Sequence, residues 1–187
     1  MSFETLARKR ASIRKYSDKK FPIETLMKII DIGNSAPSPG NLGIIRYIVV
    51  EDKEKISKIA DACMQKFIAE APYLIIVCSR SKDVEVAYDK RAKKYVKQHT
   101  GAVIENMLLY ITELGLSSCW IGAFSDMIIR DTLKIPEDIE IEAILPIAHQ
   151  SKLDKAKPRK KPGLVERIFF ETYGNKYLKP YYRKMEV

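Results

Sequence analysis

The apolar positions along the chain follow two spacings, one typical of helices and one typical of buried strands. Apolar residues recur at intervals of three and four in segments that we predict to be helices: residues 2–10, 22–36, 53–67, 98–114 and 127–135. Continuously apolar or β-branched runs predict strands at residues 44–51, 73–79, 117–124 and 139–149, the last interrupted by Pro146. Residues 80–96 are polar and follow neither spacing.

Residues that begin or end helices stand at the borders of several predicted helices. Ser2 can cap the first helix, and Pro22 suits the first turn of the second. The second helix should end before Pro37, because proline disfavours helical backbone in the residue that precedes it. Gly115 suits the C-terminal cap of the helix over residues 98–114.

The order of these elements indicates the fold class. Strands and helices are mixed without a regular strand–helix–strand period, which favours an α+β architecture over a doubly wound sheet. The sequence contains no GxGxxG or GxxxxGK[ST] motif and no internal repeat. With 187 residues, of which 46% are apolar and 30% charged, we predict a single domain over residues 1–187.

The sequence lacks the patterns of a membrane span, a disulfide framework or a metal site. Its longest apolar run, residues 71–78, is too short to cross a bilayer, and no signal peptide is evident, so we expect a soluble, cytoplasmic protein. It has three cysteines, which are widely separated and stand in apolar surroundings, as is typical of reduced, buried thiols. Neither His99 nor His149 has a cysteine or second histidine at ligand spacing, so we expect no metal.

The formal net charge of +9 favours phosphorylated or polyanionic partners. One positive cluster, RASIRKYSDK at residues 10–19, could bind such an anion. In extended backbone Arg10, Ser12 and Arg14 would project to one side and the apolar residues between them to the other. Arginine donates paired hydrogen bonds that suit phosphate. The cluster is therefore a candidate anion site, with a solvated basic loop as the alternative.

A second cluster, KPRKK at residues 157–161, lies near the other end of the chain. Pro158 favours extended backbone, which would put Lys157 and Arg159 on one face. The two clusters could share one phosphate. Taken alone, the second is also typical of a solvated linker.

Two glycine-containing stretches could approach a flat ligand. The loop APSPGNLG, residues 36–43, is rich in turn formers, and its glycines leave room for a ligand beside the polar Ser38 and Asn41; the alternative is a plain connection. Gly122 interrupts an apolar strand pattern, which suggests a bulge or a close backbone approach. We expect Trp120 in the core.

Four stretches in this order resemble the FMN-dependent nitroreductase family: RASIRKYSDKKFP, APSPGNLGIIRYIVV, IENMLLYITELGLSSCWIGAF and KPRKKPGLVE. The resemblance covers nearly the whole chain and is weakest at residues 80–96. It implies a three-layer α+β fold, with a central, mainly antiparallel sheet flanked by helices, in an intertwined homodimer that binds FMN at its interface. Residues 165–187, where tyrosines recur at a spacing of four, would be a C-terminal extension that wraps the partner subunit.

Carried over by position, the resemblance implies a set of cofactor-binding residues: Arg10, Ser12, Arg14, Pro37, Ser38, Asn41, Ile121, Gly122, Ala123, Lys157 and Arg159. The first three would bind the phosphate and ribityl side of FMN, and the two tail residues would close on the phosphate. The loop residues would meet the isoalloxazine ring from the partner subunit, while the backbone amides of residues 121–123 face its reactive edge. No catalytic side chain is implied, because the flavin carries the chemistry.

The sequence departs from the family pattern at three places. Residues 43–45 are Gly-Ile-Ile where the family usually has Gln-Pro-Trp, which removes a polar ring contact. His99 stands where aspartate is frequent, and Ser117 and Ser118 stand where many relatives have Gly-Ser. These departures leave the cofactor site intact and leave the substrate preference open.

The expected function is that of a homodimeric FMN flavoprotein that takes hydride from NADH or NADPH and reduces a nitroaromatic, quinone or similar flat acceptor. One alternative is a specialised relative that uses the same flavin site for another reduction or a dehalogenation. From another class, the alternative is a non-enzymatic, basic nucleic-acid-binding domain. The sequence distinguishes neither NADH from NADPH nor one acceptor from another, and we expect residues 80–96 to form a lid on the substrate side.

Overall fold

The computed structural model describes residues 1–154, 158 and 162–176, in which helices alternate with short antiparallel strands. The α-helices are α1 (Phe3–Lys9), α2 (Glu24–Asn34), α3 (Lys53–Ala62), α4 (Lys82–Tyr88), α5 (Ala92–Glu113) and α6 (Asp126–Leu133). The strands are β1 (Tyr16–Ser17), β2 (Ile45–Val50), β3 (Tyr73–Ser79), β4 (Glu140–Ile147) and β5 (His149–Gln150). Short 3-10 turns are η1 (Pro39–Asn41), η2 (Lys66–Glu70), η3 (Asp89–Arg91) and η4 (Val165–Arg167).

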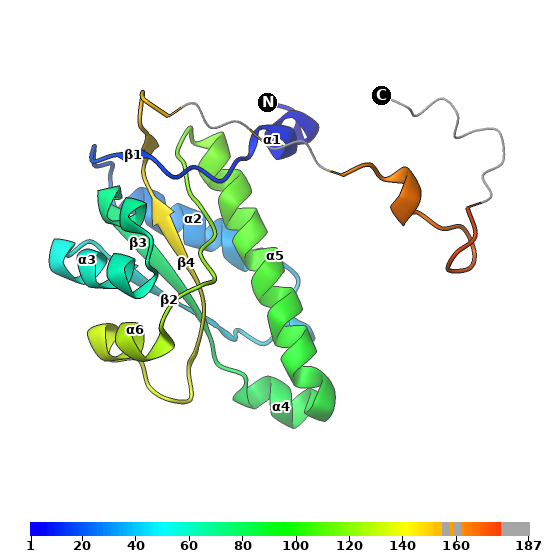
Figure 1. Ribbon diagram of the computed structural model, residues 1–187. Coiled ribbons are helices and arrows are strands. Elements are labelled where there is room, and N and C mark those ends of the chain that lie inside the picture. The colour runs from blue at the N-terminus through cyan, green and yellow to red at the C-terminus, as the bar shows by residue number, and fades with distance from the viewer. Residues whose placement is uncertain (155–157, 159–161, 177–187) are drawn as a thin grey trace.

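The described elements form three layers around one antiparallel sheet. The sheet has the order β2-β3-β4, with Ile48 opposite Ile76 and Ile76 opposite Ile144. Figure 1 shows α2 and α5 on one face of the sheet and α3 and α6 on the other. A smaller antiparallel pair, β1 with β5, lies beyond the end of β4. The three-layer α+β fold expected from the sequence is therefore confirmed.

Strand β3 is the centre of the core because both of its faces are covered by helices. Leu74, Ile76 and Cys78 pack with α3 and α6, and the alternate residues Ile75 and Val77 pack with α2 and α5. Every residue of β3 is buried. A strand covered on both sides has no polar face to alternate with, which is why its sequence is a continuous apolar run.

Several predicted element bounds are corrected by the structure. The helix expected over residues 53–67 ends at Ala62, because Met64 turns into the left-handed region with a φ of 53° and η2 follows. Residues 80–96 contain α4 and the first turns of α5, which begins six residues before the predicted start. Residues 117–124 form isolated β-bridges rather than a continuous strand. Trp120, expected in the core, is 41% exposed.

Strand β4 continues through Pro146, which the sequence suggested would interrupt it. The amides of Ile144 and Ala148 donate to the carbonyl oxygens of Ile121 and Ser117, on the side of β4 away from β3. Because alternate residues of a strand point their N–H groups the same way, the ring nitrogen of Pro146 faces that outer side too. The proline therefore removes no hydrogen bond from the ladder between β3 and β4.

The C-terminal part described, residues 162–176, stands apart from the three layers (Figure 1). The ring of Tyr173 packs against Phe169 with ring centroids 4.5 Å apart, yet Tyr173 remains 92% exposed. Leu164 and Val165 are exposed as well. No helix among the described residues is long and apolar enough to cross a membrane.

A charged network joins α5 to the sheet at the irregular pairing between β3 and β4. Lys97 on α5 donates to Glu140 and to Glu142, each at 2.8 Å, and Ser79 donates to Glu142 at 2.6 Å. The Glu142 side chain is 5% exposed and that of Glu140 is 57% exposed. Burial opposes the charge of Lys97, but its hydrogen bonds to the two carboxylates outweigh burial and raise its pKa. Its stabilising contribution is therefore complete at neutral pH and is lost only as alkaline pH removes the proton.

Removing Glu142 should destabilise the fold far more than removing Glu140, although both bind the same ammonium group. We expect Glu142→Ala to lower the free energy of unfolding by about 2 kcal/mol, because Ser79 and Lys97 lose a buried partner. Glu140→Ala should cost under about 1 kcal/mol, as exposed ion pairs contribute little. Urea denaturation at neutral pH measures both, and equal losses would contradict the assignment.

Candidate functional site

Two segments that are far apart in the sequence lie side by side on the outer edge of β4. The amide and carbonyl of Ile121 exchange hydrogen bonds with those of Ile144, both at 3.0 Å, so residues 117–121 follow the strand. The amide of Ile13 then donates to the carbonyl of Ser118 at 3.0 Å, which places residues 10–14 against residues 117–121. The structure therefore brings together the basic cluster and the glycine-containing stretch that the sequence singled out.

Two buried groups hold the basic segment in place. The side chain of Ile13 is buried, and the Tyr16 hydroxyl donates to the Ile13 carbonyl oxygen at 2.6 Å. The Tyr16 amide donates to the Glu70 carboxylate at 2.9 Å. Ser12 and Arg14, on either side of Ile13, are exposed. The alternation expected of an extended segment is thus present, and the exposed Ser12 and Arg14 side chains also hydrogen-bond to the buried thiol of Cys119.

Arg10 and Ser118 present polar atoms that have no hydrogen-bond partner among the described residues. The Nε atom of Arg10 is buried and lies 3.6 Å from the Glu105 carboxylate, which is too far for a hydrogen bond. The Oγ atom of Ser118 is buried as well, and the residue is 4% exposed. Arg10 thus keeps only a long ion pair to Glu105 and the Ser118 hydroxyl lacks a hydrogen bond, and the two residues stand on the two segments that form the candidate site. A phosphate or polyol ligand would supply the acceptors that they lack.

Residues 121–123 differ in what they can offer a ligand. The Ile121 side chain is buried and its amide is already bonded to Ile144, so this residue fixes the segment. Gly122 and Ala123 are exposed, and their amides form no hydrogen bond with other described residues. A Cβ built on Gly122 would meet nothing within 4 Å. The open space beside Gly122 can therefore admit a flat group or a second subunit.

The loop of residues 36–43 lies elsewhere in the same subunit. Gly40 and Asn41 both have left-handed backbone, with φ of 58° and 56°, and Pro37 and Asn41 are exposed. The Pro37 carbonyl lies 2.8 Å from Nδ1 of His99, in the N-terminal half of α5, whereas Arg10 approaches the C-terminal half. No hydrogen bond or ion pair among the described residues joins this loop to residues 10–14.

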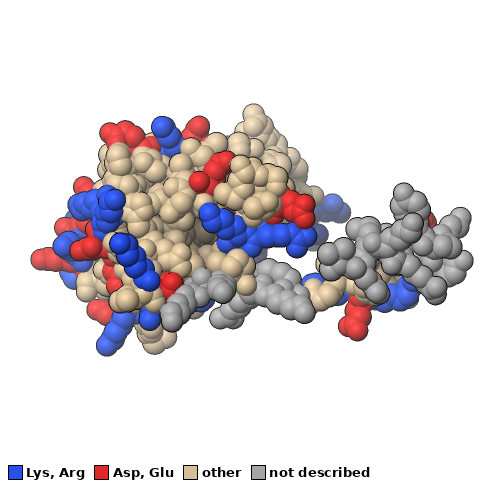
Figure 2. Space-filling view, turned by 90° about the horizontal axis from the view of Figure 1, so that it is seen from above, with Lys and Arg blue, Asp and Glu red and all other residues tan. Residues whose placement is uncertain are grey.

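The predicted tail residues Lys157 and Arg159 lie outside the described residues. The structure does describe the chain up to residue 154. The amide of Ser151 donates to the carbonyl of Lys15 at 3.0 Å, directly after β5 pairs with β1. The chain thus approaches the second basic cluster from a position beside the first. Figure 2 shows one band of Lys and Arg side chains across the middle of the molecule, with Asp and Glu side chains beside it.

Cys119 lies between these segments but is not a reactive thiol. It is 1% exposed, and burial raises its pKa, although the nearby Arg14 acts in the opposite direction. A neutral, inaccessible thiol is a poor nucleophile. Among the described residues, no group of His, Cys, Asp and Glu side chains could hold a metal ion.

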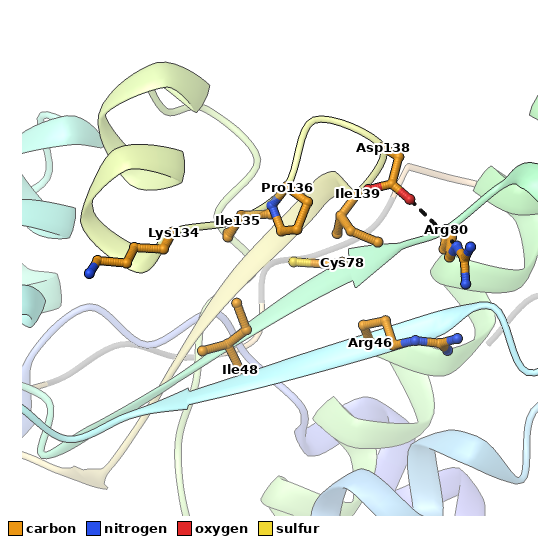
Figure 3. A pocket seen from close by; sticks show the side chains of 9 residues that line it. All are labelled: Arg46, Ile48, Cys78, Arg80, Lys134, Ile135, Pro136, Asp138 and Ile139. Carbon is orange, nitrogen blue, oxygen red and sulfur yellow. Dashed lines mark ion pairs between the residues drawn. The ribbon is translucent and has the colours of Figure 1, made fainter.

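Two hollows of the described chain lie along β2, and neither is lined by the predicted site residues. One, with a volume of about 380 Å³, is lined by Arg46, Ile48, Cys78, Arg80, Lys134, Ile135, Pro136, Asp138 and Ile139. Figure 3 shows its isoleucines and Cys78 pointing inward, with Arg80 paired to Asp138 at the rim. A neighbouring hollow of about 450 Å³ follows the same strand from Ile48 to Asp52. The first hollow thus has a mainly apolar lining, between the face of β2 and β3 and residues 134–139.

Comparison with known proteins identifies relatives over most of the chain. The family model described as "Nitroreductase family" matches residues 7–70 and 64–149. The FMN reductase [NAD(P)H] of Bacillus subtilis is 28% identical over 181 residues, covering 88% of this chain and 71% of its own. The iodotyrosine deiodinase of Thermotoga neapolitana is 23% identical over 180 residues, covering 82% and 90%.

Solved structures resemble the subunit closely. A nitroreductase family protein from Clostridium difficile 630 is 33% identical, with a TM-score of 0.76 over 92% of this chain and 99% of its own. An FMN-dependent nitroreductase from C. difficile R20291 is 26% identical, also with a TM-score of 0.76, over 90% and 98%. The likeness spans nearly the whole of each chain.

Proposed function

Because the chain belongs to the nitroreductase family, we propose that it is an FMN-dependent oxidoreductase that takes hydride from NADH or NADPH and reduces a nitroaromatic, quinone or similar flat acceptor. One observation carries this proposal: residues 10–14 lie against residues 117–121, where buried polar atoms of Arg10 and Ser118 lack hydrogen-bond partners among the described residues. A phosphorylated, flat cofactor matches this combination of cationic and open backbone surfaces. Bound FMN would supply the hydride chemistry, since no side chain of the site does so.

Each segment has a separate role in holding the cofactor. Arg10, Ser12 and Arg14 bind the phosphate and ribityl side, where guanidinium groups can donate paired hydrogen bonds. Lys157 and Arg159, which follow the segment beside Lys15, close on the phosphate. Gly122 and Ala123 offer free amides to the edge of the ring, and Ile121 anchors them to β4. The loop residues Pro37, Ser38 and Asn41, of which Pro37 and Asn41 are exposed and Ser38 is half-buried, contact the ring bound by a second subunit, since they lie away from the site of their own.

A homodimer would complete this site and cover the open edge of β2. The outer edge of β2 pairs with no other strand in the described chain, and unpaired edges readily accept another strand. The hollow that includes Ile48 and Cys78 has a mainly apolar lining, while Val165 and Tyr173 are exposed on the C-terminal extension. The extension of one subunit, residues 165–187, would cover the other. Both exposed surfaces would then be buried at once.

A dehalogenating activity at the same site is the second candidate. It is favoured by the similarity to the iodotyrosine deiodinase of Thermotoga neapolitana over 82% of the chain. The same cofactor residues would serve both activities, so only the acceptor differs. Assays with a nitroaromatic, a quinone and a halogenated phenol, each supplied with NADH or NADPH, separate the two.

The function as a whole is tested by flavin content and kinetics. The purified protein, incubated with FMN and freed of excess, should retain flavin in a fixed ratio to protein. Donor and acceptor would occupy the same face of one flavin in turn, so plots of reciprocal rate should be parallel, as in a ping-pong mechanism. A protein that retains no FMN but binds DNA with strong salt dependence would support the nucleic-acid alternative.

Arg10 and Arg14 should be required for FMN affinity, whereas Arg8 should not. Each charge-assisted hydrogen bond contributes roughly 1.5 to 3 kcal/mol, so Arg10→Ala or Arg14→Ala should weaken binding about tenfold to over a hundredfold. Arg8, exposed on α1 and paired with Glu4, is a matched control whose removal should leave affinity unchanged. Flavin fluorescence titration measures all three. Equal affinity in the wild type and both site variants would refute the assignment of this segment.

Removal of the C-terminal extension should abolish the dimer. A chain truncated after Arg167 loses the tyrosine-rich segment, so the open edge of β2 and the mainly apolar hollow would stay uncovered. We expect monomer or aggregate with little bound FMN, as measured by sedimentation velocity with detection at a flavin wavelength. A truncated chain that sediments as a flavin-loaded dimer would show that the extension is dispensable.

A further inference from the structure

A side chain of α5 attaches the loop of residues 37–41 to the helix layer through a hydrogen bond. Nδ1 of His99 lies 2.8 Å from the Pro37 carbonyl oxygen, and His99 is only 7% exposed. A carbonyl oxygen can only accept a hydrogen bond, so Nδ1 must carry the hydrogen. The contact therefore fixes the tautomer and orientation of the ring together with the position of the carbonyl.

The other hydrogen bonds described for this loop are local. The Asn41 amide donates to the Ser38 carbonyl at 3.4 Å, and the Leu42 amide donates to the Pro39 carbonyl at 3.0 Å. These bonds shape the turn η1 but do not attach it to a neighbouring element. Within the described chain, His99 thus supplies the hydrogen bond that attaches residues 37–41 to the helix layer.

A second contact from the same region limits where the loop can move. Gly40 has a φ of 58°, and a Cβ built on it would lie 3.0 Å from the Tyr88 hydroxyl at the end of α4. Tyr88 is held in turn by Tyr95 of α5, with the rings edge to face and their centroids 5.1 Å apart. The loop is therefore fixed by a hydrogen bond at Pro37 and by close packing at Gly40.

We propose that His99 is a positioning residue for the flavin site. By donating from Nδ1 to Pro37, it fixes residues 37–41 in the conformation that contacts the isoalloxazine ring bound by the second subunit. This inference rests on the proposed function, because it is the FMN site that gives the loop its role. It also gives α4 a role, because Tyr88 at the end of this helix packs against Gly40 of the loop.

Three substitutions separate positioning from simple structural support. Asparagine places an amide nitrogen where Nδ1 stands, so His99→Asn can keep the hydrogen bond, whereas His99→Gln moves the amide one bond further out. Thr100 is the matched control: it is 3% exposed and neighbours His99 on α5, but its hydroxyl donates to the Val96 carbonyl at 2.9 Å, inside the helix. Thr100→Val thus removes a buried hydrogen bond without touching the loop.

Hydrogen exchange and FMN affinity give two independent measurements. In the protein without FMN, His99→Gln should speed amide exchange in peptides covering residues 38–43, while His99→Asn and Thr100→Val should not. After loading, His99→Gln should weaken FMN binding about three- to tenfold, the range expected for one lost hydrogen bond, and His99→Asn should stay within about twofold of the wild type. The bound flavin's absorption spectrum should change in the Gln variant alone.

The outcomes distinguish this inference from the proposed function. If the wild type binds FMN but His99→Gln matches Thr100→Val in loop exchange, affinity and spectrum, His99 has no positioning role. If His99→Gln speeds exchange in the loop but the wild type binds no FMN, the hydrogen bond from His99 does hold the loop. Both the proposed function and the role assigned to the loop in binding FMN are then wrong. Faster loop exchange with weaker FMN binding in His99→Gln, restored by asparagine, supports the inference.

Discussion

The candidate site depends on the hydrogen bonds that fasten residues 117–121 to the outer edge of β4. Ile121 exchanges two hydrogen bonds with Ile144, and Ser118 in turn accepts the amide of Ile13. The basic segment is therefore attached to the sheet through an intermediate strand-like segment, and the buried Ile13 and Tyr16 prevent it from rotating. A rigid sheet thus determines the position of Arg10, Ser12 and Arg14, although none of them belongs to a regular element. Such support is what a site on irregular backbone needs for constant geometry.

Within one chain the expected cofactor residues lie in two separate groups, and the long helix α5 is the reason. The long helix α5 approaches Arg10 through Glu105 and holds the loop through His99, at different heights along its length. One helix therefore fixes both groups but keeps them apart. Two copies arranged about a twofold axis could each contribute one group to a shared site. The sheet edge at β2 and the exposed apolar residues of the C-terminal extension point to the same arrangement.

The features that sequence reasoning predicted are those governed by short-range pattern. The continuous apolar run of β3 and the cap at Ser2 follow from local rules, and the structure reproduces the strand over residues 73–79 and the hydrogen bond from Thr5 to Ser2. Features governed by tertiary contact were missed: nothing near Glu105 or His99 in the sequence indicates that these side chains meet Arg10 and Pro37. Trp120 was misplaced because its apolar neighbours face the core while it faces outward. The start of α5 was missed because its first turns carry lysines on the exposed face, which weakened the apolar spacing.

Pro146 has a consequence for the behaviour of the protein at high concentration. Its ring nitrogen, without a hydrogen, faces the outer edge of β4, next to residues 117–121 that bond only at isolated positions. A foreign strand that displaced those residues would find one donor missing from the edge, and the pairing would be interrupted at that point. The proline thus protects this side of the sheet from edge-to-edge aggregation during folding, before the segments of the site have docked. The edge at β2 has no proline, so the newly made chain would be more vulnerable to strand pairing on that side.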